Sequence, residues 1–123
     1  MAGTLTISTL SDGTNSTSAT NCIQGSAKAW VNFTNTGSTS VIASYNVSSV
    51  TYVSTGTYTV NMTNAMSNAN YAVVTSSGVG GGNGLYMVQN TSTKTTSAFG
   101  LIGRNGPSNA LTDPGTSYAA VFS

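Results

Sequence analysis

Few side chains of this sequence could do chemistry. The chain of 123 residues has no histidine, and its only carboxylates are Asp12 and Asp113. Without histidine, no Ser–His or Cys–His relay can activate a nucleophile. A hydrolytic carboxylate pair would require Asp12, near the N-terminus, to approach Asp113, which lies in an Asp-Pro-Gly turn signal. The sequence therefore predicts a protein that is not an enzyme.

Metal ligands are equally scarce. Cys22 is the only cysteine, so one thiol and two aspartates are the whole supply of anionic ligands. That supply is too small for a four-ligand zinc site or for a calcium loop with several carboxylates. A single cysteine also excludes an internal disulfide, which fits folding in a reducing cytoplasm. We expect neither a metal nor a cofactor.

Two glycine- and asparagine-containing stretches are candidate exposed binding loops. The first is Gly78–Gly84 (GVGGGNG), and the second is the turn Arg104–Pro107 (RNGP). A phosphate-binding glycine loop leads from a strand into a helix, whereas Leu85–Val88 reads as a strand, so we expect a wide hairpin loop. The candidate binding residues on these loops are Gly80, Gly81, Gly82, Asn83, Arg104 and Asn105.

The elements that must position these loops are strands. Short runs of alternating apolar and polar residues recur roughly every ten residues, separated by Asn, Gly, Ser and Thr. In Thr57–Thr63, the period of two puts Tyr58, Val60 and Met62 on one face of a half-buried strand. Similar runs lie at 27–34, 41–45, 47–53, 71–75, 85–88, 95–102 and 118–122. The pattern predicts an all-β fold, an antiparallel β-sandwich or jelly-roll-like barrel, over residues 26–123.

The composition predicts self-association. Only 4% of the residues are charged, and Ser and Thr together make 40 residues. Exposed sheet edges are commonly protected by charge, and this chain has little of it. With a net charge of +1 and no apolar run near the ~20 residues of a membrane helix, we expect no nucleic-acid binding and no membrane insertion.

Residues 1–25 are expected to form an N-terminal arm and linker. Gly3–Thr9 alternates long enough for one short strand, and Ser11–Asn21 is polar. The arm would pair with a neighbour, with Leu5 and Ile7 as candidate interface residues; the alternative is a first strand and long loop of the same sandwich. Deleting residues 1–21 should leave a cooperatively folding domain.

Trp30 is a third candidate interface residue. It alternates with Val31 and therefore faces away from the side chains of Val31 and Phe33. Tryptophan is enriched at interfaces, so this position favours a subunit contact or a second layer. The alternative is a core tryptophan in a strand that is buried on both faces.

The segment 27–74 resembles a module of tailed-phage virion proteins. The runs that carry the resemblance are AKAWVNF (27–33), ASYNVSSV (43–50), GTYTVNM (56–62) and NANYAVV (68–74). The module recurs in tail-fibre-like proteins of phages that infect aquatic bacteria and cyanobacteria. Where relatives often have arginine before the Ala-Ser-Tyr-Asn run, this chain has Ile42, so any ion pair of that arginine is absent here.

The resemblance implies a homotrimeric, tail-fibre-like virion protein that is assembled in the host cytoplasm, exposed on the particle and involved in attachment to host-surface glycans. The alternative is a capsid decoration (cement) protein that binds the major capsid protein and stabilises the shell. A chain that begins at Met1 favours the alternative, because fibre proteins usually place such a module after a long shaft. The expected partners are the chain itself and other tail or capsid proteins.

Overall fold

The computed structural model describes residues 3–35, 38–78 and 84–123. Almost all of its regular structure is β-strand. The strands are β1 (Thr9–Ser11), β2 (Ser16–Ser18), β3 (Ala29–Thr34), β4 (Ser40–Tyr45), β5 (Val47–Ser54), β6 (Thr57–Met62), β7 (Ala72–Gly78), β8 (Leu85–Asn90), β9 (Ala98–Asn105) and β10 (Thr116–Phe122). The described helices are α1 (Ala19–Gly25) and the single 3-10 turn η1 (Thr91–Thr93).

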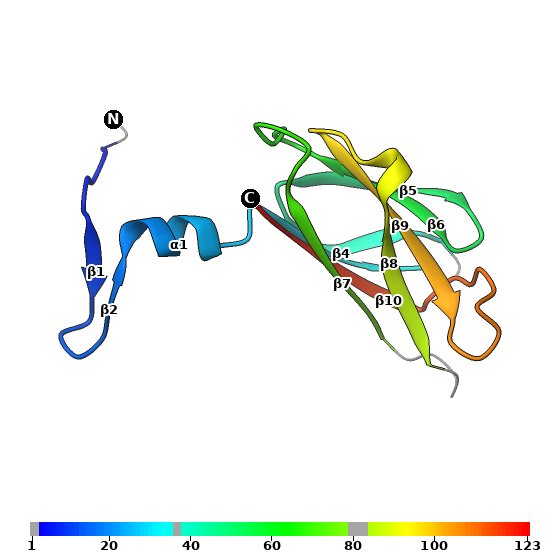
Figure 1. The fold of residues 1–123 in the computed structure, drawn as a ribbon. Helices are drawn as coiled ribbons and strands as arrows, with labels where there is room; N and C mark the ends of the chain where they lie inside the picture. The colour runs from blue at the N-terminus through cyan, green and yellow to red at the C-terminus, as the bar shows by residue number, and fades with distance from the viewer. Residues whose placement is uncertain (1–2, 36–37, 79–83) are drawn as a thin grey trace.

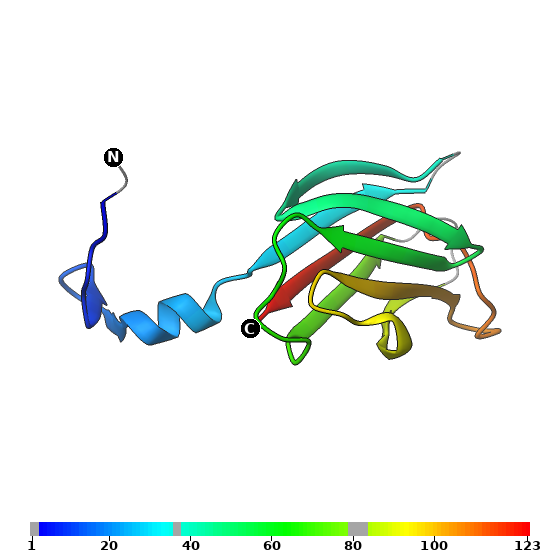
Figure 2. The same ribbon diagram turned by 90° about the horizontal axis from the view of Figure 1, so that it is seen from above.

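Eight of the strands form two four-stranded antiparallel sheets that face each other (Figures 1 and 2). One sheet has the order β4-β3-β10-β7, and the other has the order β5-β6-β9-β8. Hairpins join neighbours within a sheet, as in β5–β6. The strands β7 and β8, like β9 and β10, belong to different sheets, so the hairpin expected at Gly78–Gly84 is wrong. The expected all-β antiparallel sandwich is therefore the fold of this chain.

The core lies between the sheets and follows the period of two. In β6, Tyr58, Val60 and Met62 are buried, as the alternation predicts. Phe33 of β3 meets Tyr58 across the core, edge to face, with ring centroids 5.5 Å apart. Apolar burial of this kind supplies most of the stability of a sandwich, because neither sheet can bury its inner face alone.

Asn46 forms the corner between β4 and β5, where the sequence predicts a break. Its φ of 54° lies in the left-handed region, which asparagine tolerates better than most residues. Its side-chain Nδ2 donates to the backbone carbonyls of Lys28 (3.1 Å) and Asn64 (3.2 Å), and its Oδ1 accepts from the Asn64 N–H (2.8 Å). The corner thereby fixes the chain where it passes from one sheet to the other.

The N-terminal segment, residues 3–25, lies outside both sheets (Figure 1, blue). The expected strand at Gly3–Thr9 is wrong, because the first strand is only Thr9–Ser11. The expected polar linker at Ser11–Asn21 is also wrong, because this segment forms β2, which pairs with β1, and then continues into α1. The Ser18 hydroxyl caps α1 by accepting from the Asn21 N–H (3.2 Å). Hydrogen bonds from side chains to the nearby backbone thus stabilise this segment in place of apolar contacts. The domain boundary at 25/26 stays a prediction.

Strand β9 differs from the expected strand 95–102 at both ends. It starts at Ala98, whose N–H binds the Thr95 hydroxyl (3.0 Å) in a turn, and it continues through Asn105. The ladder with β8 persists to the pair Leu85 and Asn105, which is why the strand is longer. Arg104 and Asn105 therefore belong to a strand, and the expected turn at 104–107 begins later.

Candidate functional site

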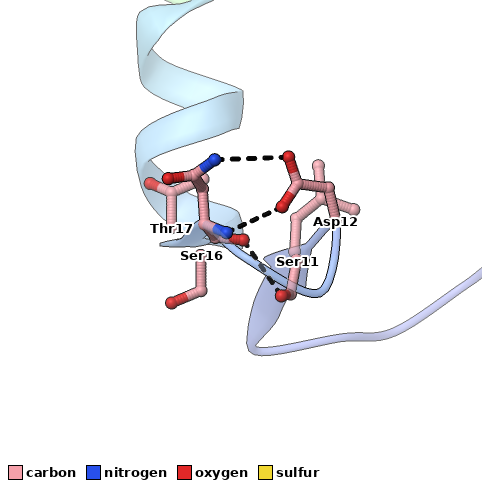
Figure 3. Close-up of a pocket in the computed structure, with 6 residues that line it drawn as sticks. Ser11, Asp12, Ser16 and Thr17 are labelled. Atoms are coloured by element: carbon pink, nitrogen blue, oxygen red, sulfur yellow. Dashed lines mark hydrogen bonds between the residues drawn. The ribbon is translucent and has the colours of Figure 1, made fainter.

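The two carboxylates lie in separate parts of the fold. Asp12 lies in the β1–β2 turn, where its Oδ1 accepts from the backbone N–H groups of Asn15 (2.7 Å) and Thr14 (2.9 Å). Figure 3 shows the Asp12 carboxylate in this turn beside Ser11. These bonds, the one from the Asn15 N–H most strongly, hold the pKa of Asp12 below its ordinary value. Asp12 is therefore a turn-forming side chain.

Asp113 belongs to the loop between β9 and β10. Figures 1 and 2 show this loop (orange) at the end of the sandwich away from the N-terminal segment. The Oδ1 atom of this aspartate accepts from the Tyr58 phenol (2.5 Å) and from the Gly56 N–H (2.6 Å), and its Oδ2 accepts from the Tyr52 phenol (3.4 Å). Burial raises the pKa of Tyr58, and the hydrogen bond to the Asp113 carboxylate raises it further. The phenol stays protonated and donates.

No described group of three or more His, Cys, Asp or Glu side chains could hold a metal ion. What lies beside Asp113 instead is a hollow of about 490 Å³ lined by Asn35, Ser38, Thr39, Tyr52 and Asp113. Tyr52 is 47% exposed, so its ring is open to a ligand. Hydroxyl, amide and carboxylate groups around an exposed ring can bind a polyhydroxylated molecule such as a sugar.

A second exposed feature is the outer side of the β4-β3-β10-β7 sheet. The register places Tyr45, Trp30, Ala120 and Val74 in one row across four strands, with Tyr118 in the next row. We call these five residues the Trp30 face. The exposed fractions of its large side chains are 40% for Trp30, 58% for Tyr45, 59% for Val74 and 42% for Tyr118.

Trp30 faces away from Val31 and Phe33, as predicted, and it is not buried within this chain. The alternative of a strand buried on both faces is therefore wrong for β3. Such a group of exposed aromatic and branched side chains on one sheet face is a candidate interaction surface.

The N-terminal segment carries its own apolar surface. The exposed fractions are 81% for Leu5, 41% for Ile7, 53% for Leu10 and 64% for Ile23. These four side chains and Cys22 line one shallow hollow of the segment. We call these five residues the arm face. Helix α1 has no buried residue. The two predicted interface residues Leu5 and Ile7 thus lie together on an uncovered surface.

The structure describes the predicted binding residues of only one of the two loops. Gly80, Gly81, Gly82 and Asn83 lie outside the described residues. Arg104 lies near the end of β9, where its Nη1 donates to the Asn109 carbonyl (2.7 Å), and Asn105 follows it in the strand. The hollow beside Asp113 does not include these two residues among its lining.

Sequence reasoning missed the grouping of Tyr52, Tyr58 and Asp113. The one available signal was the Asp-Pro-Gly turn, which identifies a loop but not the strand beneath it. The phenol of Tyr58 and the carboxylate of Asp113 are 55 residues apart in the chain, so only the packed sheets bring them together.

None of the described helices is long and apolar enough to cross a membrane. Comparison of the sequence with protein-family models and with curated proteins, and of the fold with solved structures, finds no match. The geometry that bears on function is thus the two exposed apolar surfaces and the hollow beside Asp113.

Proposed function

We propose that this chain is a non-enzymatic structural protein of a tailed-phage virion, a homotrimeric, tail-fibre-like module that is exposed on the particle and takes part in host attachment. The observation that carries the proposal is the pair of uncovered apolar surfaces, the Trp30 face and the arm face, on a chain that is 4% charged. Such surfaces suit a protein that works in an assembly. The resemblance of residues 27–74 to a tail-fibre module selects the virion and the trimer.

The hollow beside Asp113 supports the attachment role. The loop that carries Asp113 lies at the end of the sandwich away from the N-terminal segment, so an assembly held through that segment would present this loop outward (Figure 2). A host-surface glycan offers hydroxyl groups to Asp113 and Asn35 and an apolar ring face to Tyr52. Tyr52 and Asp113 are the residues we assign to glycan contact.

A capsid decoration protein is the second candidate. The observation that favours it is the N-terminal segment, which is folded and apolar on one side yet lies outside the sandwich. A segment of this kind can dock on the major capsid protein while the sandwich covers the shell surface.

Sedimentation velocity of the purified chain at low and at high salt tests the assembly. We expect a trimer at micromolar concentration in both, because few charges are available to be screened. A stable monomer in both buffers contradicts the trimer and favours the decoration protein, which would order on the capsid.

Immunogold labelling of the phage that encodes the chain tests its location. Labels at the tail support the fibre module, and labels over the whole head support the decoration protein. Purified virions without any label contradict both.

A further inference from the structure

One chain holds two apolar surfaces that do not cover each other. The Trp30 face is aromatic and the arm face is aliphatic, and their large side chains are between 40% and 81% exposed. The charged side chains, Asp12, Lys28, Lys94, Arg104 and Asp113, belong to neither set. Contact between the two faces would bury apolar area without removing a charge from water, so no desolvation of ions opposes it.

The joint between the N-terminal segment and the sandwich keeps the two faces of one chain apart. The Lys28 N–H donates to the Val121 carbonyl (2.7 Å), which fixes the start of β3 on β10. The Lys28 ammonium donates to the Ile23 carbonyl and to the Ser26 hydroxyl (3.0 Å), so the same residue also holds the end of α1. In Figures 1 and 2, α1 leads away from the sandwich instead of back along its sheet.

The position of the Trp30 face favours a partner that enters from the same end. Trp30 follows the first residue of β3, so its row lies at the end of the sheet from which the N-terminal segment departs. A copy placed beside this end can lay its own N-terminal segment across that row. In a closed ring each copy gives one segment and receives one, which satisfies both faces on every chain.

From these observations we infer that the Trp30 face of each copy is covered by the arm face of a second copy of this chain. The copies are thus joined by exchange of their N-terminal segments. The inference rests on the homo-oligomer of the proposed function and names its contact: Leu5, Ile7 and Ile23 of one copy pack on Trp30 and Tyr118 of the next.

Cross-linking between two versions of the chain tests the contact. Wild-type protein, whose only cysteine is Cys22, is dissociated, mixed with a Cys22→Ser/Ser76→Cys variant, reassembled and treated with a short bis-maleimide. Ser76 is exposed and pairs with Tyr118 on the outer side of the sheet. The matched control is Cys22→Ser/Val88→Cys, because Val88 is exposed on the outer side of the other sheet.

We expect a mixed dimer that links Cys22 to position 76, identified by peptide mass spectrometry. Its yield should exceed that of the Val88→Cys control about tenfold or more, because neighbouring thiols react at a high effective concentration. Equal yields from the two positions overturn the inference. A Ser76→Cys chain that keeps Cys22 and links only within itself also overturns it, since the segment then folds back on its own sheet.

Charge substitutions in α1 test the same contact without new cysteines. Ile23→Asp should weaken the oligomer about tenfold or more in sedimentation, because a carboxylate would enter an apolar contact. Asn21→Asp adds the same charge two residues away on the helix and should leave the oligomer intact.

An oligomer that resists Ile23→Asp contradicts the exchange but not the trimer. Cross-linking at position 76 in a protein that never labels virions contradicts the proposed function but not the exchange.

Discussion

Asp113 organises one end of the sandwich at the scale of single residues. Its carboxylate joins the loop before β10 to the β5–β6 turn, through Gly56, and to the core, through Tyr58. A hydrogen bond to a charged acceptor contributes about 1.5–3 kcal/mol. The same carboxylate also borders the hollow that we assign to glycan contact. The stability of this end and the proposed glycan contact thus share one side chain.

The raised pKa of Tyr58 predicts a loss of stability at alkaline pH. The unfolded chain ionises this phenol near its ordinary value of 10.0, whereas the folded chain keeps it protonated. The stabilisation is therefore complete below about pH 10 and is lost as the pH rises above that value.

Tyr58→Phe should flatten this alkaline fall in the free energy of unfolding and lower stability at neutral pH by about 1–3 kcal/mol. Tyr71, whose pKa burial also raises, should leave a residual slope. Denaturant titrations from pH 8 to pH 11 are the measurement. The control is Tyr86→Phe, because the Tyr86 phenol donates to the amide oxygen of Asn109 and not to a carboxylate. An unchanged slope in Tyr58→Phe would show that the phenol does not carry the effect.

At the scale of elements, β6 shows how a period of two becomes a core. It is a central strand between β5 and β9, and its buried side chains alternate with half-buried Thr57, Thr59 and Asn61. A charged side chain should therefore cost more stability on the buried face of β6 than on its outer face.

Val60→Asp should destabilise the fold by about 3 kcal/mol or more, because a carboxylate would be buried without a partner. Thr59→Asp, on the outer face of the same strand, should cost below about 1 kcal/mol. Chemical denaturation of both variants provides the comparison. Equal losses of stability would mean that β6 is covered on both sides.

The β5–β6 turn depends on a glycine. Gly56 has a φ of +66°, and a Cβ atom there would lie 2.6 Å from the Gly103 carbonyl oxygen and 2.8 Å from the Thr112 nitrogen. Both the backbone conformation and the close packing against Gly103 and Thr112 exclude a side chain.

Gly56→Ala should therefore lower the free energy of unfolding by about 3 kcal/mol or more. Gly115→Ala, in the adjacent loop, is the matched control, because nothing lies within 4 Å of its Cβ position. We expect the control to melt within a few degrees of the wild type. A much smaller loss in the free energy of unfolding for Gly56→Ala would show that the turn shifts to admit a methyl group.

At the scale of the whole molecule, the sandwich and the N-terminal segment make unequal contributions to the core. All the buried hydrophobic residues described come from Ala29 onward. Deleting residues 1–25 should consequently leave a cooperatively unfolding, strand-rich domain by circular dichroism. The same deletion should remove the oligomer if segments are exchanged.

The control for this deletion is removal of Thr116–Phe122, which is β10. That strand lies between β3 and β7, so its loss should prevent folding altogether. An unfolded product from the N-terminal deletion would instead make the segment an integral part of the sandwich.

The sequence alone determined that residues 26–123 form strands and which faces of β3 and β6 are buried. Alternation is a local property, because successive side chains of a strand must point to opposite sides. Tyr58, Val60 and Met62 could be assigned to the core, and Trp30 to the opposite face, before any sheet was known. The absence of histidine and glutamate likewise restricted the chemistry from composition alone.

Only the tertiary structure decided which loops and faces meet. The bond between Tyr58 and Asp113 spans 55 residues, and the row from Tyr45 to Val74 requires four strands of which only β3 and β4 are consecutive in the chain. The N-terminal linker folded where alternation predicted none, because hydroxyl and carboxylate groups satisfied its backbone. Long-range pairing depends on how sheets order their strands, and a period of two carries no information about that order.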